Sequence, residues 1–226
     1  MIGKGKSISH GVAALEYDLA KEINGQAVAT EIARHELYGC TGAEMVQEMK
    51  PYHIDFPNVK NNCLRFEVSP SIEESATFTD ADWAELGNDF MQRMGLANHQ
   101  YIIIRHSGTE SKKEQAHLHI LANRVSLSGE LYRDNWIGKK ATEAANAIAK
   151  ERNFVQSQDI GKVNKAEIKE AMDGVLKKMQ GFDFTKFKEE LGKRGFKVRE
   201  ARASTGKLNG YYVTARSGTE YKASEI

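Results

Sequence analysis

Two apolar segments in the middle of the chain carry its clearest hydrophobic pattern. Residues 99–105 contain three consecutive isoleucines, and β-branched residues on both faces are typical of a strand inside a sheet. Residues 117–125 alternate, so that His117 and His119 share one face with the other odd-numbered positions. A polar loop lies between the segments. The pattern therefore predicts an antiparallel hairpin at the centre of a sheet.

This hairpin would bring three histidines together. His106 ends the first strand and His117 begins the second, while His119 projects from the same face as His117. Neutral imidazoles are common metal ligands, and three of them leave coordination positions open. A lone pair of histidines on a strand is more often a solvated face, but the third histidine favours a metal site. Asn123, further along this face, could orient a ligand or a water.

The N-terminal segment predicts an edge strand and then an amphipathic helix. Residues 1–8 are short and basic with alternating isoleucines, and Ser9 is a suitable N-cap for a helix to about Ile23. The apolar stripe of that helix would hold Val12, Leu15, Leu19 and Ile23. Tyr17 falls on the opposite, polar face. It is either an ordinary exposed tyrosine or a nucleophile directed towards a site.

Further elements follow from capping signals and periodicity. Thr41 has the capping-box pattern of a short helix, and residues 79–95 form the clearest helix, with an apolar stripe that reads as core. The segment 63–69 alternates as a strand with Glu67 on its polar face. If this strand neighbours the histidine hairpin, Glu67 could support the site or accept a proton. His53 falls in a loop and reads as a surface residue. Three more helices and a small β-hairpin are expected in segments 139–152, 163–180, 184–193 and 196–216.

Composition places the chain among ordinary globular proteins. It has 226 residues, of which 40% are hydrophobic and 28% charged. No apolar run approaches the roughly 20 residues that span a bilayer, and the N-terminus lacks the apolar core of a signal peptide. We therefore expect no membrane partner. The two cysteines, Cys40 and Cys63, are expected to be reduced thiols in a cytoplasm.

The net charge of +1 conceals an asymmetry along the chain. Residues 161–226 hold 15 lysines and arginines against 9 acidic residues, whereas residues 1–160 hold 17 against 22. A basic C-terminal third is compatible with a polyanionic partner. On charge alone, a solvated helical surface rich in lysine is the simpler reading.

The predicted fold class is α+β, with a central antiparallel sheet that carries the three-histidine site and is flanked by helices. Residues 1–160 would form the catalytic core, and residues 161–226 a helical and β-hairpin extension of the same domain. An exposed tyrosine together with a histidine metal site suggests phosphodiester transesterification. Tyrosine has a free pKa of about 10, so it needs a positive centre or a base to become a nucleophile.

Three segments resemble the plasmid mobilisation relaxases, which are single-strand DNA nicking enzymes of the histidine–hydrophobic–histidine class. They are IIIRH with HLHILANRV, the opening GKGKSISHGVAALEYDLAKE, and the tail FKEELGKRGFKVREARASTGKLNGYYVTARSGTEYKASE. The resemblance implies that Tyr17 attacks a scissile phosphate at an origin of transfer and forms a 5′-phosphotyrosine intermediate. It also implies that His106, His117 and His119 hold Mg²⁺ or Mn²⁺. Ligand chemistry alone would prefer Zn, Ni or Cu for imidazoles.

The resemblance extends to partners and to further residues. The implied partner is single-stranded DNA with an adjacent hairpin, with accessory mobilisation proteins as possible partners and no nucleotide cofactor. Glu67 and Asn123 would join Tyr17 as catalytic residues. His99 is the alternative to His106, because Gly108 stands where many relatives carry an acidic residue. The chain stops where relatives continue, so we expect it to be a truncated fragment. Candidates for contacts to the DNA backbone are Lys4, Lys6, Arg124, Lys139 and Lys140.

Two other functions fit part of this pattern. One is a replication initiator with the same histidine chemistry, although such initiators place the tyrosine after the histidines, and here Tyr17 precedes them. The other is a non-catalytic single-stranded DNA-binding domain whose histidines are structural. That domain would bind no metal and would lose affinity steeply as salt rises.

Overall fold

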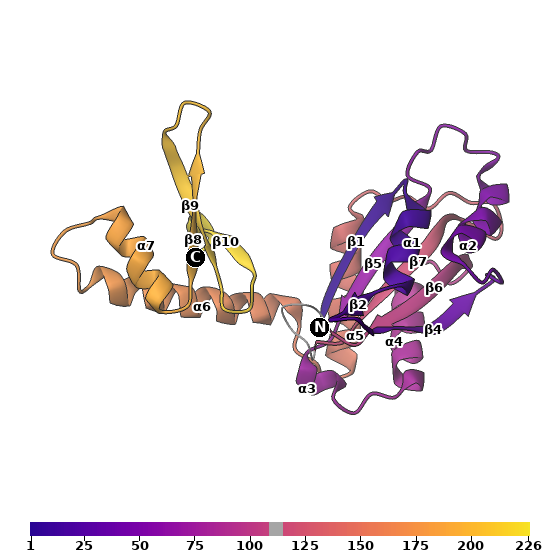
Figure 1. Cartoon of the computed structure of the whole chain (residues 1–226), viewed down its shortest axis with the longest axis horizontal. Helices are drawn as coiled ribbons and strands as arrows, with labels where there is room; N and C mark the ends of the chain where they lie inside the picture. The colour runs from indigo at the N-terminus through magenta and orange to yellow at the C-terminus, as the bar shows by residue number, and fades with distance from the viewer. Residues whose placement is uncertain (109–114) are drawn as a thin grey trace. The chain divides into compact units, whose positions relative to one another are not determined.

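Five antiparallel strands form the main sheet of this computed structural model, which describes residues 1–108 and 115–226. Their order is β1-β5-β7-β6-β4, so the predicted histidine hairpin, β6 and β7, lies within the sheet (Figure 1). The chain divides into two compact units, Met1–Ser157 and Gln158–Ile226. The elements of the first unit are β1 (Ile2–Ile8), α1 (Gly11–Leu19), β2 (Glu22–Ile23), β3 (Gln26–Ala27), β4 (Ala29–His35), α2 (Gly42–Met49), the 3-10 helix η1 (Lys50–His53), β5 (Cys63–Ser69), α3 (Ile72–Ser75), α4 (Asp80–Arg93), β6 (His99–His106), β7 (His117–Ser126) and α5 (Ile137–Glu151).

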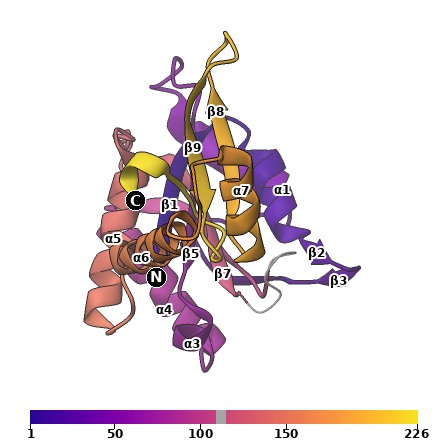
Figure 2. The same ribbon diagram turned by 90° about the vertical axis from the view of Figure 1, so that its left-hand side faces the viewer.

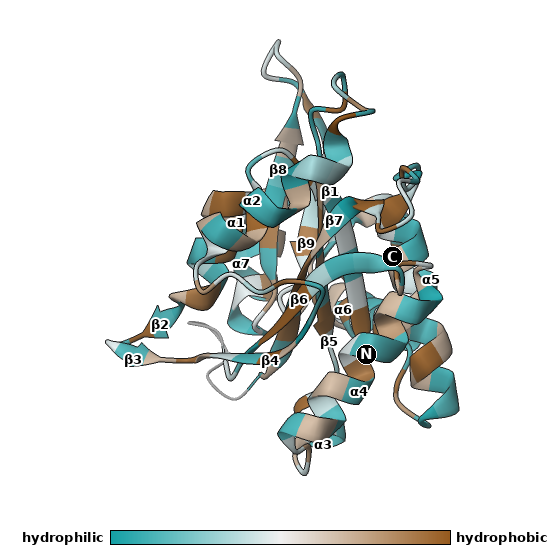
Figure 3. Ribbon diagram, turned by 90° about the vertical axis from the view of Figure 1, so that its right-hand side faces the viewer, coloured by the Kyte–Doolittle hydropathy of each residue, from teal (hydrophilic) through white to brown (hydrophobic). Residues whose placement is uncertain are grey.

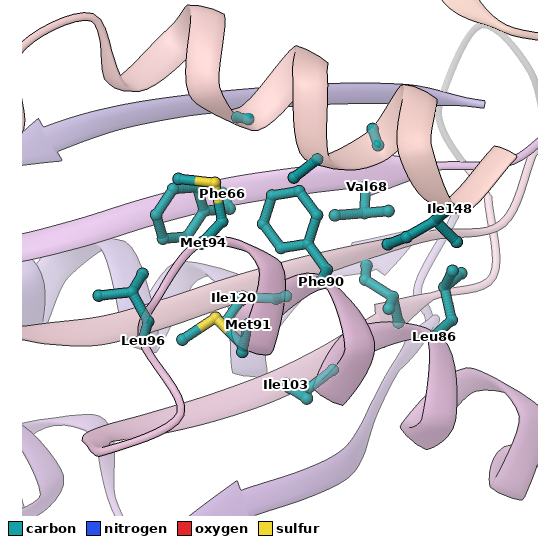
Figure 4. Close-up of a cluster of buried hydrophobic side chains, with 14 of the residues drawn as sticks. Phe66, Val68, Leu86, Phe90, Met91, Met94, Leu96, Ile103, Ile120 and Ile148 are labelled. Carbon is teal, nitrogen blue, oxygen red and sulfur yellow. The ribbon is translucent and has the colours of Figure 1, made fainter. Parts of the chain in front are cut away.

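The two faces of the sheet carry separate apolar cores. Helices α4 and α5 cover one face, where side chains of β5, β6 and β7 meet those of the helices around Phe90 (Figure 4). Helices α1 and α2 cover the other face, around Leu15 and Ile102. Strand β6 is buried along almost its whole length and is largely hydrophobic in colour, whereas the β2–β3 hairpin is hydrophilic (Figure 3). Burial on both faces explains the isoleucine run in β6.

Close packing between β1 and α5 depends on small residues. A Cβ atom added at Gly3 would lie 2.4 Å from the carbonyl oxygen of Ala141 and 2.6 Å from the Cβ of Ala145. Gly5 is similarly close to the ring of Phe66. The glycines of the basic N-terminal strand therefore allow the alanine-rich helix to approach the sheet edge. The predicted edge strand and the predicted alanine-rich helix are both confirmed, with boundaries shifted by a few residues.

The second unit, Gln158–Ile226, has its own core. Its elements are α6 (Ser157–Leu176), α7 (Phe184–Lys193), β8 (Lys197–Arg202), β9 (Leu208–Thr214), β10 (Glu220–Lys222) and the 3-10 helix η2 (Ala223–Glu225). Helix α7 packs beside β8, and Ile168, Phe187 and Val213 are among the buried residues (Figure 2). The expected hairpin is confirmed, and β10 extends it to an antiparallel sheet of order β10-β9-β8. That this segment belongs to the same domain as the first unit stays a prediction.

The N-terminal helix is shorter than the periodicity predicts. Its N-cap is His10, not Ser9, and it ends at Leu19, because residues 22–27 form a small hairpin. Asn24 and Gly25 have φ of 54° and 74°, the left-handed values of a tight hairpin turn. The buried face of α1 is formed by Gly11, Ala14, Leu15 and Asp18, while Val12 is 39% exposed. The predicted capping box at Thr41 is present, and Thr79 forms another at the start of α4.

Two further parts of the first unit, residues 26–40 and His53, differ from what their sequence suggests. Residues 26–40, which show no clear period, contain strand β4 at the sheet edge. His53 is half-buried and bonded to Asn123, so the prediction of a surface histidine is wrong. Among the helices of the described residues, none is both long enough and apolar enough to cross a membrane.

Candidate active site

The three predicted histidines converge at one end of the β6–β7 hairpin. His106 pairs directly with His117, and His119 follows on the same face of β7. One ring nitrogen from each lies within 4.8 Å of those of the other two. Strand pairing explains this geometry, because directly opposed residues and alternate residues of one strand project from the same face. The predicted cluster of His106, His117 and His119 is therefore confirmed as an arrangement of side chains.

Backbone carbonyls determine which nitrogens of two histidines remain available. The Nε2 atom of His106 lies 2.7 Å from the carbonyl oxygen of Asp18, and Nδ1 of His117 lies 3.0 Å from that of Gln115. Since a carbonyl only accepts, each of these nitrogens carries the proton. This leaves Nδ1 of His106 and Nε2 of His117 unprotonated, and the latter lies 3.1 Å from Nε2 of His119 inside the cluster. Hydrogen bonds of this kind orient metal-binding imidazoles.

Burial favours the uncharged form of two histidines of the cluster, His106 and His119. It lowers the pKa of His119 to about 2, with further contributions from the neighbouring His106, His117, Arg65 and Lys4. Burial is also the main cause that lowers the pKa of His106. Neutral imidazoles are the form that binds metals, and the converging nitrogens of the three rings fit a divalent cation. The donor set leaves the remaining coordination positions to substrate or water.

Helix α1, which carries the candidate nucleophile Tyr17, contacts this cluster through the carbonyl of Asp18. Tyr17 is 57% exposed, and Lys21 donates a hydrogen bond of 2.7 Å to its hydroxyl. The neighbouring Asp18 binds His106 through its carbonyl, and the charge of Lys21 contributes to the lowered pKa of His106. Sequence reasoning missed Lys21. The helix expected to about Ile23 would have placed Lys21 one turn from Tyr17; in the structure Lys21 lies just beyond the end of α1 and still reaches the phenol.

Asp18 and Arg65 form a second feature that sequence reasoning missed. Asp18 is only 1% exposed, and Arg65 donates to both of its carboxylate oxygens, at 2.5 and 3.0 Å. The same guanidinium lies 3.4 Å from Nδ1 of His119, and the carboxylate lies 3.8 Å from it. The signal in the sequence was Arg65 on the polar face of its strand. Its partner on α1 comes from a distant segment, so only the fold reveals the pair.

Glu67 lies next to the cluster, because its strand, β5, pairs with β7 of the histidine hairpin. The sequence suggested a role for Glu67 under this condition. Glu67 pairs with His119 across β5 and β7, and its carboxylate accepts a hydrogen bond of 2.9 Å from Lys4. A hollow of about 220 Å³ lies here, and Lys6 is also among its lining residues. The strand order therefore brings Lys4, Lys6 and Glu67 to the same side of the sheet as the histidines.

The structure does not bring Asn123 to the cluster. Its side chain is fully buried, with hydrogen bonds to His53, Gln100 and the backbone of Met49 and Val125. In the described part of the chain, none of these bonds goes to the three histidines, so the predicted catalytic role is not supported by a contact. His99 starts β6 at the other end, where it bonds the carbonyl of Asn123, which places it outside the cluster as well.

The remaining predicted DNA contacts have different environments. The guanidinium of Arg124 donates hydrogen bonds to the carboxylate of Asp134, at 2.6 Å, and to the carbonyls of Asn61 and Tyr132. Lys140 donates to the carbonyl of Arg133 and lies over the ring of Tyr132. Lys139 is exposed and lies 3.8 Å from Glu143. Of these three cations, Lys139 is the most accessible to a polyanion.

The described residues thus form an antiparallel sheet with a histidine cluster and an exposed tyrosine on the helix that contacts His106. The family model described as "Relaxase: MobA/VirD2-like, nuclease domain" matches residues 17–154. The chain therefore belongs to this family, and the resemblance seen in the sequence is confirmed. Comparison with curated proteins gives no match.

Similar solved structures include three of the conjugative relaxase TrwC in complex with oriT DNA. The metal-bound form is 11% identical with a TM-score of 0.40, and the metal-free form is 10% identical with a TM-score of 0.41; both alignments cover 92% of this chain and 74% of that one. The copper-bound form is 12% identical, with coverages of 92% and 75% and a TM-score of 0.37.

Proposed function

We propose that this protein nicks and rejoins one DNA strand at an origin of transfer, with Tyr17 as the nucleophile. The observation that carries the proposal is the contact between the backbone carbonyl of Asp18, the residue after Tyr17, and His106 of the cluster. This contact supports a common site for the tyrosine helix and the three imidazoles. Family membership supports the same chemistry, because the family model that matches residues 17–154 describes a nuclease domain.

The reaction exchanges one phosphodiester for another. The hydroxyl oxygen of Tyr17 attacks the scissile phosphorus, the bond from phosphorus to the 3′ oxygen breaks, and the 5′-phosphate becomes linked to tyrosine. The phenol proton passes to a base, for which Glu67 is the predicted carboxylate, and the same group returns the proton to the 3′ oxygen, which leaves as a hydroxyl. Because bonds of similar energy are formed and broken, the reverse reaction rejoins the strand.

Lys21 and the histidines have separate tasks in this proposal. The ammonium of Lys21, hydrogen-bonded to the phenol oxygen, stabilises the negative charge that develops there during attack. His106, His117 and His119 would hold a divalent cation, Mg²⁺ or Mn²⁺, through the nitrogens that their backbone contacts leave available. When bound, this cation supplies Lewis-acid polarisation of a phosphate oxygen.

The proposed substrate is single-stranded DNA beside a hairpin, with Lys4, Lys6 and Lys139 as backbone contacts. These lysines are exposed, and Lys4 and Lys6 lie on the strand next to β5 at the site. Arg124 and Lys140 would contribute less, since protein groups already occupy them. Such a reaction on plasmid DNA belongs to the cytoplasm, and accessory mobilisation proteins would be its further partners.

A denaturing gel tests this function directly. The protein is mixed with Mn²⁺ and a 5′-labelled or 3′-labelled oligonucleotide that contains the transfer origin of its own plasmid. A covalent adduct on the 3′ fragment, lost with chelator and with Tyr17→Phe, is the expected result. Tyr38→Phe is the matched control, because Tyr38 is also exposed, at 76%, and should retain the adduct.

Two outcomes would contradict parts of the proposal. Cleavage without an adduct would make water the nucleophile and remove Tyr17 from the mechanism. Binding of the oligonucleotide with neither cleavage nor adduct would favour a non-catalytic single-stranded DNA-binding domain.

A further inference from the structure

The hollow beside His119 has the features of a phosphate-binding subsite. We propose that it holds a phosphodiester group of the bound DNA strand next to the one at the histidine cluster, with Arg65 as its principal contact and Asp18 as the residue that positions Arg65. The identity of this ligand as DNA rests on the proposed function. The hollow itself is a feature of the fold, and its size of about 220 Å³ suits a group smaller than a drug-sized ligand.

Cations outnumber anions among the side chains that line the hollow. Three positive side chains and one carboxylate face it, and the full lining is Lys4, Gly5, Lys6, Arg65, Phe66, Glu67 and His119. Lys4 pairs with Glu67 at 2.9 Å, so these two charges largely cancel. Lys6 and Arg65 remain, and they are opposite each other on β1 and β5. A paired register of this kind directs both side chains to the same face of the sheet.

Asp18 holds the guanidinium of Arg65 in one orientation. Its two carboxylate oxygens accept from Nε and Nη2, at 3.0 and 2.5 Å. A guanidinium has five N–H donors; two go to Asp18 and Nη2 also lies 3.4 Å from Nδ1 of His119, which leaves the two donors of Nη1 for another partner. Arg65 is 21% exposed and lines the hollow, whereas Asp18 is buried behind it. The arginine is therefore preorganised for an anion at the hollow's surface.

The position of the hollow decides which phosphate it would hold. His119 belongs both to the hollow and to the histidine cluster, and Nη2 of Arg65 lies 3.4 Å from its Nδ1. A phosphate against Arg65 would therefore lie immediately beside the one that approaches the cluster. Two adjacent anchoring points would align the strand for attack by Tyr17, which is the residue before Asp18.

The test measures DNA binding without metal, so that it does not depend on cleavage. Fluorescence anisotropy with labelled single-stranded dT12 in EDTA is recorded over a range of NaCl concentrations. The test variant is the double substitution Asp18→Asn with Arg65→Gln, which removes both members of the buried pair and leaves the net charge unchanged. Asp89→Asn with Arg93→Gln is the matched control, because this ion pair of 2.7 Å lies on α4, on the other face of the sheet.

The test variant should bind dT12 about tenfold more weakly than the wild type, since it loses charge-assisted hydrogen bonds. Its plot of log affinity against log salt should also be shallower by about 0.7, the value for one released counterion on a single strand. The control should match the wild type in both. Equal affinity and slope for the test variant and the control would overturn the proposal, as would failure of the wild type to bind dT12.

A second variant covers the case in which the test variant does not fold, as judged by circular dichroism. Lys6→Gln changes an exposed side chain of the same hollow and should reduce the salt slope by a similar amount, about 0.7. An unchanged slope would again overturn the subsite. Absence of an adduct in the gel assay with intact, Arg65-dependent dT12 binding would instead refute the proposed reaction and leave the subsite standing.

Discussion

Lowering the pH from 7 to 5 should destabilise the metal-free protein more than a variant that lacks His119. Burial and the neighbouring positive groups lower the pKa of His119 to about 2 in the folded state. In the unfolded chain the same imidazole has a pKa of about 6.5. Between these values the unfolded state binds a proton that the folded state does not bind. The free energy of unfolding therefore falls as the pH falls below about 6.5.

The size of the effect follows from the two pKa values. Protonation of this imidazole stabilises the unfolded state by RT ln(1 + 10^1.5), about 2 kcal/mol, at pH 5, and by only about 0.2 kcal/mol at pH 7. His119 alone should therefore cost about 2 kcal/mol between these pH values. His106 acts in the same direction, because its pKa is also lowered by burial.

Urea unfolding in EDTA at pH 7, 6 and 5, followed by tryptophan fluorescence, measures this effect. Both tryptophans, Trp83 and Trp136, belong to the unit Met1–Ser157, and Trp83 is only 2% exposed, so the signal reports the sheet that carries the cluster. The variant His119→Gln cannot titrate in this range and should lose about 2 kcal/mol less than the wild type. If the two proteins show the same pH dependence, the argument from burial of His119 is wrong.

Urea unfolding with added Mn²⁺ tests the metal site in the same two proteins. Mn²⁺ at about 100 times its dissociation constant should raise the free energy of unfolding at pH 7 by about 2.7 kcal/mol in the wild type. It should have little effect on His119→Gln, because one of three ligands is missing. An equal increase in both proteins would place the metal elsewhere.

Three further predictions test the packing of the fold. Gly3→Ala should destabilise the protein by about 1–3 kcal/mol, because the new Cβ would lie 2.4 Å from a backbone oxygen. Gly192→Ala, on an open helix surface, should instead stabilise it by about 0.5–1 kcal/mol. Urea unfolding measures both changes, and equal effects of the two substitutions would refute the close-packing argument. Ellman's reagent should modify exposed Cys40 rapidly and Cys63 only on unfolding, since burial raises the pKa of the Cys63 thiol to about 12; rapid reaction of two thiols would contradict this. Thr79→Ala should cost about 1 kcal/mol by removing a capping box, and an unchanged urea midpoint would show that the cap is unimportant.

Local signals in the sequence were sufficient for most of the elements. Strands β5, β6 and β7 follow from the alternation of two segments and from the isoleucine run of the third. The starts of α2 and α4 follow from the capping residues Thr41 and Thr79. The errors fall where a stronger local feature competes with periodicity. The stripe through Ile23 suggested a longer helix, but the Asn24–Gly25 turn forms a hairpin there. β4 was missed because an edge strand with mixed burial shows no regular alternation.

The sequence by itself determined the pair His117 and His119 on one face of a strand, because alternation is a local property of β structure. It also indicated that His106 would join them, since a hairpin pairs the ends of its strands. Only the tertiary structure decided that α1 lies over this face, so that Asp18 binds Arg65 and His106, and Lys21 accompanies Tyr17. It equally decided that Asn123 is committed to His53 and Gln100. Contacts between distant segments depend on how sheet and helices pack, and residue spacing along the chain carries no record of that packing.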